Sequence, residues 1–115
     1  MKAILEINEP EFEAEVLNSE RPVLVSFWAA WSQPCRVLEP VLDEVASQCN
    51  GRAKIVKVNA DDNPDLGLWL GIHSIPTLLI FTDGNVVGKI VGTASKQAIL
   101  SKLETVSAEK KATNL

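Results

Sequence analysis

Two kinds of apolar pattern alternate along the chain, and together they predict its elements. Short, nearly continuous apolar runs between turn residues are typical of buried strands. Such runs cover residues 3–7, 22–28, 53–59, 77–81 and 86–91. The segment between the last two runs, Thr82-Asp83-Gly84-Asn85, has the composition of a tight hairpin turn. We therefore expect five strands, the last two joined as a hairpin.

Apolar residues spaced three and four apart predict helices between these strands. The expected helices are residues 8–17, residues 35–49, residues 65–70, and a last helix that begins at Ser95. The resulting order, β-α-β-α-β-α-β-β-α, is typical of a mixed sheet with helices on both faces. We expect one α/β domain over residues 1–107, followed by a polar tail over residues 108–115 that frays.

Composition excludes several classes of function. The 115 residues are 46% hydrophobic and 23% charged, with a net charge of −4, so we expect neither a nucleic acid nor a lipid surface as a partner. No apolar run is long enough to cross a bilayer, and Glu6 interrupts the N-terminal apolar residues before they can form a signal-peptide core. We expect a monomer in a reducing compartment, either a bacterial cytosol or a stroma-like space.

The two cysteines, Cys35 and Cys49, are expected near opposite ends of one helix. Their separation along that helix is roughly 21 Å, whereas a disulfide needs Cα atoms within about 7 Å. A disulfide within the chain is therefore excluded, and any disulfide through either cysteine joins two molecules. One histidine, His73, and two distant cysteines do not make a zinc site, so we expect no metal and no cofactor.

Four short segments, in this order and at this spacing, resemble the thioredoxin family along almost the whole chain. They are Phe27-Trp28-Ala29-Ala30-Trp31, Pro34-Cys35 with Pro40 following, Lys57-Val58-Asn59-Ala60-Asp61, and Gly71-Ile72-His73-Ser74-Ile75-Pro76-Thr77. The resemblance implies the thioredoxin fold, a central mixed five-stranded sheet flanked by four helices. It also implies a cis peptide bond between Ile75 and Pro76, in a turn that faces the active-site loop.

The active-site loop departs from the family pattern, which is Trp-Cys-Gly-Pro-Cys. Here the loop reads Trp31-Ser32-Gln33-Pro34-Cys35. By resemblance, Ser32 stands in place of the attacking thiol, and Cys35 corresponds to the thiol that resolves the mixed disulfide. A serine hydroxyl does not ionise near neutral pH, so Ser32 cannot act as that nucleophile.

A second departure lies beneath the loop. The resemblance places Ser26 where the family commonly keeps a buried aspartate, beside a retained Lys57. Without that acid, Lys57 would lose its charge, reach toward water or bond Ser26. The candidate catalytic positions are therefore Cys35, Ser32, Ser26 and Lys57.

These losses predict a protein that is not a competent dithiol–disulfide reductase. Our first hypothesis is a binding module that holds a protein or peptide partner in the family's apolar groove. By resemblance, the groove residues are Trp31, Gln33, Pro34, Ile75, Pro76 and Gly92. The alternative is a monothiol redox protein, in which Cys35 accepts glutathione or forms a mixed disulfide with a partner.

Several of these residues also have purely structural interpretations. Ser32 is most simply the N-cap of the helix that follows it. Cys35 and Cys49 are both small enough to pack as apolar side chains. Trp69 is either a core residue or part of a widened contact surface. We interpret Ser32 as natural divergence rather than an engineered trap, because trapping variants remove the resolving cysteine and keep the attacking one.

Overall fold

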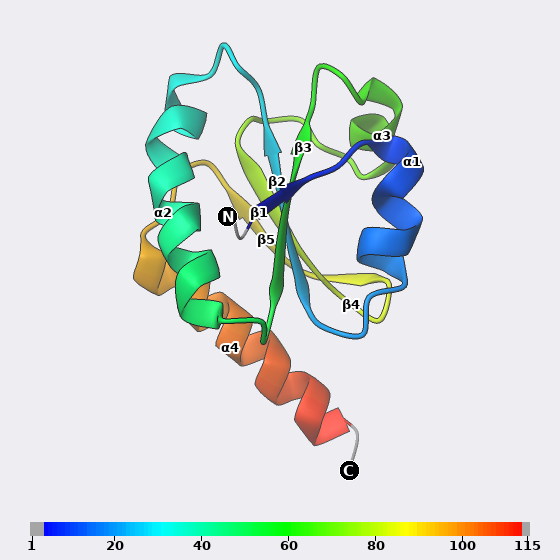
Figure 1. Ribbon diagram of the computed structural model, residues 1–115, viewed down its shortest axis with the longest axis vertical. Coiled ribbons are helices and arrows are strands. Elements are labelled where there is room, and N and C mark those ends of the chain that lie inside the picture. Colours follow the sequence, from blue (N-terminus) through cyan, green and yellow to red (C-terminus); the bar gives the residue numbers. More distant parts are fainter. Residues whose placement is uncertain (1–3, 114–115) are drawn as a thin grey trace.

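The computed structural model describes the backbone of residues 4–113 and the side chains of residues 4–106. Its strands are β1 (Ile4–Glu6), β2 (Val23–Trp28), β3 (Lys54–Asn59), β4 (Thr77–Thr82) and β5 (Asn85–Val91). They form one sheet in the order β1-β3-β2-β4-β5 (Figure 1). The pairs β1–β3 and β3–β2 are parallel, and β2–β4 and β4–β5 are antiparallel. The five expected strands and the mixed sheet are confirmed, although Ala3, the expected first residue, lies outside the described residues.

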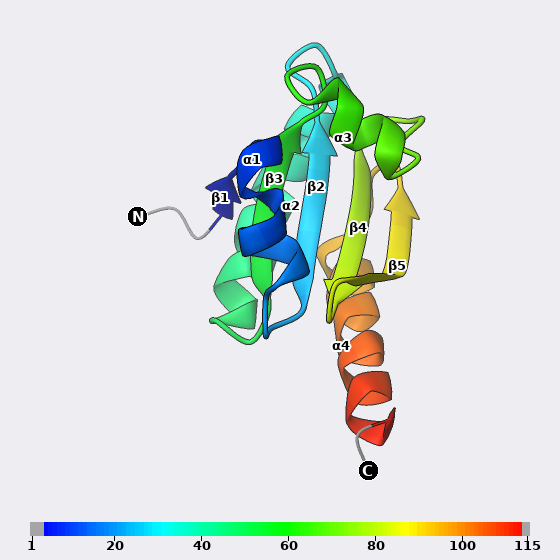
Figure 2. The same ribbon diagram turned by 90° about the vertical axis from the view of Figure 1, so that its right-hand side faces the viewer.

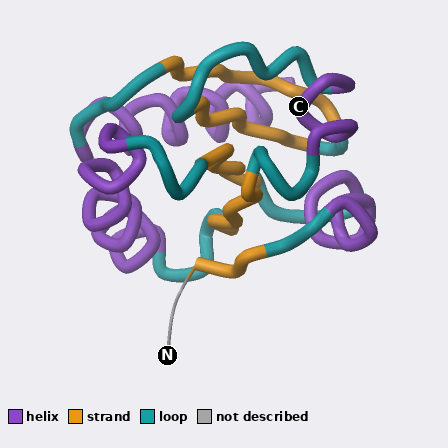
Figure 3. The backbone as a smooth tube through the Cα atoms, turned by 90° about the horizontal axis from the view of Figure 1, so that it is seen from above, coloured by secondary structure: helices purple, strands orange, loops and turns teal. Residues whose placement is uncertain are grey.

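Helices cover both faces of the sheet, as Figures 2 and 3 show. On one face lie α1 (Glu9–Phe12), which continues directly into the π-helical turn η1 (Glu13–Leu17), and α3 (Pro64–Trp69). On the other face lie α2 (Gln33–Cys49) and α4 (Lys96–Thr113). The thioredoxin fold implied by the resemblance is therefore the fold of this chain. Among the described helices, none is both long and apolar enough to span a membrane.

Each helical layer has its own apolar core, because side chains alternate between the two faces along every strand. In β2, Leu24 packs under α2 and α4, whereas Val25 and Phe27 pack with the residues of α1 and α3. Ser26 and Trp28 share the face of Leu24, since residues two apart in a strand point the same way. Both side chains are thereby directed toward α2.

The backbone of the last helix continues into the segment expected as a polar tail. We expected the folded domain to end at residue 107, but the backbone of α4 is helical as far as Thr113. The residues beyond 107 are mostly alanine, glutamate and lysine, which have high helix propensity, and no glycine or proline interrupts them. Asn114 and Leu115, the end of the expected tail, lie outside the described residues.

A two-residue turn joins β4 to β5. Asp83 and Gly84 both have positive φ values, 52° and 79°. Left-handed backbone at both central residues is the type I′ geometry, whose twist matches that of the flanking strands. The hairpin predicted from Thr82-Asp83-Gly84-Asn85 is confirmed.

The inner position of β4, between β2 and β5, predicts a large cost for truncating its apolar side chains. Leu78 is 0% exposed in the core beneath α2 and α4. We expect Leu78→Ala to lower the free energy of unfolding in urea by about 2–5 kcal/mol, because it removes buried methyl groups and leaves a cavity. Val86→Ala on the exposed side of β5 is the control, and we expect it to cost less than about 1 kcal/mol. Equal costs for the two variants would contradict this placement of β4.

Candidate functional site

Strand pairing brings four chain segments together at one edge of the sheet. Thr77, the first residue of β4, pairs with Phe27 near the end of β2 and with Val91 at the end of β5. Trp28, the last residue of β2, pairs with Asn59, the last residue of β3. The segments that follow β2, β3 and β5 and the segment that precedes β4 therefore share this edge, at the top of Figure 1.

The first of these segments leads into α2, and Ser32 is the N-cap of that helix. Its backbone is extended, and its side-chain Oγ accepts a hydrogen bond from the Cys35 N–H at 3.4 Å. Pro34 lies in the first turn, where its missing N–H breaks no helical hydrogen bond. The N-cap interpretation of Ser32 is confirmed. Both Ser32 and Cys35 are buried, Cys35 with 8% of its surface exposed.

Trp31 is held at the surface beside this helix start. Its indole Nε1 donates to Asp61 Oδ2 at 2.9 Å, and the side chain is 68% exposed. Asp61 is positioned in turn by Asn59, whose Oδ1 accepts from the Asp61 N–H at 2.9 Å. Gln33 and Pro34 are also exposed. An apolar ring fixed in place but open to solvent is suited to contact with a second molecule.

The remaining groove residues come from the other side of the same edge. The peptide bond between Ile75 and Pro76 is cis. The Gly92 N–H donates to the Pro76 carbonyl oxygen at 2.9 Å, which ties the turn before β4 to the end of β5. Gly92 has a φ of 87°, a conformation that favours glycine. Ile75 and Gly92 are partly exposed, whereas Pro76 is buried.

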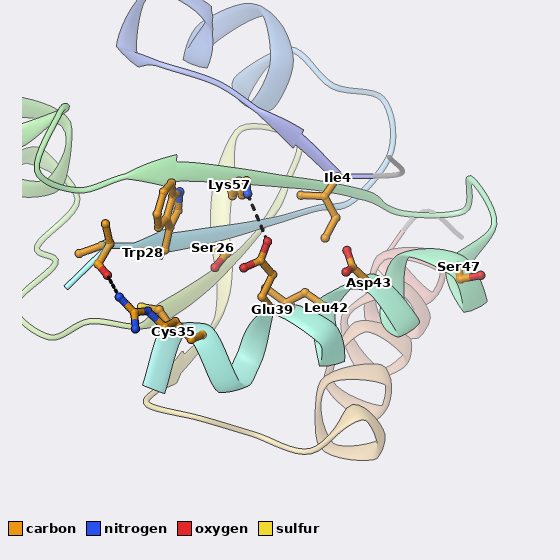
Figure 4. A pocket seen from close by; sticks show the side chains of 12 residues that line it. Ile4, Ser26, Trp28, Cys35, Glu39, Leu42, Asp43, Ser47 and Lys57 are labelled. Carbon is orange, nitrogen blue, oxygen red and sulfur yellow. Dashed lines mark hydrogen bonds and ion pairs between the residues drawn. The ribbon is translucent and has the colours of Figure 1, made fainter. Parts of the chain in front are cut away.

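A pocket of about 710 Å³ lies beneath the start of α2, between this helix and the sheet (Figure 4). Ser26 and Trp28 line it from β2, Lys57 from β3, and Cys35 and Glu39 from α2. Cys35 can therefore be approached from the pocket even though little of its surface is exposed. Trp28 Nε1 is buried here and has no hydrogen-bond partner among the described residues.

The positive charge of Lys57 is balanced by two groups that were not expected from the sequence. Its Nζ lies 3.8 Å from Glu39 Oε1 and 5.1 Å from the centre of the Trp28 ring. The sequence had suggested that Lys57 would lose its charge, reach toward water or bond Ser26. Its recorded contacts are instead with Glu39 and the Trp28 ring, and not with Ser26. One signal was available in the sequence, because Glu39 is four residues after Cys35 and so shares its helix face.

Cys49 lies at the far end of α2 and is a packing residue. It belongs to the core beneath α2 and α4, and both cysteines are free. Burial raises the pKa of the Cys49 thiol, the Glu104 carboxylate raises it further, and the Arg52 guanidinium opposes both. Within residues 4–106, no group of histidine, cysteine and acidic side chains could hold a metal ion.

His73 and Trp69 both lie at the surface. His73 is exposed in the turn before β4. Trp69 is 66% exposed and touches Phe12 edge-on, with ring centroids 6.5 Å apart. The core interpretation of Trp69 is therefore wrong, because a six-residue helix at the surface buries only part of its apolar face.

Comparison with known proteins agrees with the fold. The family model described as Thioredoxin matches residues 3–105. The chain belongs to the thioredoxin family. Similar proteins include Thioredoxin 1 of Nostoc sp., 47% identical over 104 residues, and thioredoxin of Synechocystis sp., 46% identical over 104 residues. Each alignment covers 90% of this chain and 97% of the relative. Thioredoxin of Haemophilus influenzae is 47% identical over 96 residues, which are 84% of this chain and 90% of that protein.

These relatives correct the functional expectation drawn from the loop. We expected a thioredoxin-fold protein without disulfide-reductase competence, either a partner-binding module or a monothiol redox protein. Relatives named thioredoxin that are 42–47% identical over most of the chain contradict that expectation. That expectation rested on Ser32 and Ser26, whereas the likeness to thioredoxins extends over most of the chain.

The cap geometry predicts a specific cost for removing the Ser32 hydroxyl. Ser32→Ala takes away the acceptor of the Cys35 N–H, so we expect a loss of about 1 kcal/mol in the free energy of unfolding. Ser47→Ala, at an exposed position inside the same helix, is the matched control and should not destabilise the protein. The two changes would be compared by urea denaturation, and equal effects would contradict the cap.

Proposed function

We propose that this protein is a competent reductant of protein disulfides, as a thioredoxin is, with Cys35 taking part in the exchange. This proposal replaces the expectation of a protein without disulfide-reductase competence. The observation that carries the proposal is the position of Cys35. It lies in the first turn of α2, on the wall of the pocket and at the sheet edge where the groove residues gather. The match to the thioredoxin family over residues 3–105 supports the same reaction.

The groove residues would hold the substrate. Trp31 and Pro34 on one side, and Ile75, Pro76 and Gly92 on the other, supply apolar and backbone surface for an extended peptide segment. Gln33 lies between Trp31 and Pro34 in the sequence and is exposed in the first turn of α2. A substrate held across this edge would present its disulfide near the start of α2.

Cys35 is the one thiol that lines the pocket beneath α2, and the proposed exchange begins with it. The Cys35 thiolate attacks one sulfur of the substrate disulfide, and the other substrate sulfur leaves as a thiolate. The positive end of the α2 dipole favours the negative charge that this step requires. Glu39, one helical turn after Cys35 and also lining the pocket, would accept the thiol proton, with Lys57 as its counter-ion.

A second thiol must complete the two-electron reduction. In this atypical loop Ser32 caps the helix instead of supplying that thiol, so a small dithiol reductant supplies it. One sulfur of the dithiol attacks the Cys35 sulfur and releases the reduced substrate. The other closes the dithiol into a ring and regenerates the Cys35 thiol. We propose a reducing compartment such as the cytoplasm as the place of action, because thiols are kept reduced there.

Reduction of insulin by dithiothreitol, followed as turbidity, tests this proposal. We expect the protein to accelerate precipitation at least about fivefold over dithiothreitol alone, because a thiolate held in the groove meets the substrate in a productive orientation. Cys35→Ser should remove the acceleration.

Cys49→Ser is the matched control, since Cys49 lies in the core at the other end of the same helix. It should retain the acceleration of the unaltered protein. The proposal fails if the unaltered protein is no faster than dithiothreitol alone, or if Cys35→Ser is as fast as Cys49→Ser.

A further inference from the structure

A second hollow, of about 370 Å³, lies between α1–η1 and α3, on the face of the sheet opposite α2. Phe12 and Leu66 are its buried lining residues, and Trp69 stands beside them with its ring edge-on to Phe12. Figure 2 shows α1 and α3 in front of the sheet on this face. None of the residues that line the hollow belongs to the groove or to the pocket beneath α2.

Two large apolar side chains on α3 are exposed to solvent. Trp69 is 66% exposed, and its neighbour Leu68 is 78% exposed. Both lie on α3, and Trp69 is one of the residues that line the hollow. Large apolar side chains exposed together mark surfaces that contact another molecule more often than isolated ones do.

Acidic side chains surround this apolar surface. Glu9 and Glu13 lie one turn apart on α1–η1, and Asp65 lies in the first turn of α3. None of the three forms an ion pair with another described residue. No lysine, arginine or histidine is among the lining residues.

The charges decide between possible occupants. A symmetric pair of this chain would place three carboxylates of one copy against three of the other, and like charges at an interface are unfavourable. Anionic lipid and nucleic acid are repelled for the same reason, and the chain as a whole carries a net charge of −4. A cationic partner is attracted both by the carboxylates and by the face of the exposed Trp69 ring.

We propose that the hollow between α1 and α3 docks a basic segment of a partner protein, with a lysine or arginine side chain against Trp69 and between Glu9, Glu13 and Asp65. An apolar side chain of the same segment would pack on Leu68. The proposal does not depend on the disulfide exchange proposed above, because the two surfaces share no residue.

The chain offers a matched pair of exposed tryptophans for the test. The probe is a fluorescein-labelled peptide of about eight residues that alternates arginine and leucine, and its binding is followed by fluorescence anisotropy at low salt. We expect saturable binding that Trp69→Ala weakens at least about tenfold and that Trp31→Ala changes less than about twofold. Insulin reduction should show the reverse, with Trp69→Ala as active as the unaltered protein.

A charge variant separates electrostatic attraction at this site from the overall charge of the protein. Glu9→Gln with Glu13→Gln and Asp65→Asn should weaken binding at least about tenfold. Glu6→Gln with Glu20→Gln and Glu104→Gln removes the same number of charges from exposed positions outside the hollow, and should weaken it less than about threefold.

Four results would overturn the proposal. The first is no saturable binding of the basic peptide, and the second is equal affinity of Trp69→Ala and Trp31→Ala for it. The third is equal binding of a peptide with glutamate in place of arginine. The fourth is sedimentation of the unaltered protein as a dimer that Trp69→Ala dissociates, which would make a second copy the occupant.

Discussion

The pairing of β2 with strands on both of its sides is the constraint on which the rest of the structure depends. β2 is parallel to β3 and antiparallel to β4, and five of its six residues are buried. Because side chains alternate with a period of two, a slip of one residue would exchange its faces. Leu24 would leave the core beneath α2, and Ser26 and Trp28 would turn away from Cys35. The same register places Thr77 beside Phe27, and so brings the cis peptide bond to the edge that carries Trp31.

The two faces of the sheet acquire different chemistry from this arrangement. On the α2 side, a single thiol lies above a pocket that contains the Lys57–Glu39 ion pair and the Trp28 ring. On the α1–α3 side, exposed apolar surface is surrounded by carboxylates without ion-pair partners among the described residues. A substrate in the groove and a basic partner on α3 would therefore contact separate parts of the surface.

Local patterns predicted most of the fold, and long-range packing accounts for what they missed. Apolar runs identified all five strands, and the Asp83-Gly84 turn and the Ser32 cap depend on residues close in sequence. The sequence placed Glu39 on the same helix face as Cys35, but its pairing with Lys57 depends on how α2 crosses β3. The exposure of Trp69 was equally hidden, since a helix as short as α3 has no clear periodicity. The functional expectation failed because the departures at Ser32 and Ser26 were given more weight than the likeness of the rest of the chain to thioredoxins.

The central claim is that the sheet edge makes Cys35, and not Cys49, the thiol that reacts with disulfides. The most direct measurement is the rate at which each cysteine of the native protein reacts with an aromatic disulfide that releases a coloured thiolate. The account predicts a fast phase of one equivalent in Cys49→Ser and only a slow phase in Cys35→Ser, at least about tenfold slower, because Cys49 is packed in the core. A fast phase that survives in Cys35→Ser and is lost in Cys49→Ser would contradict it.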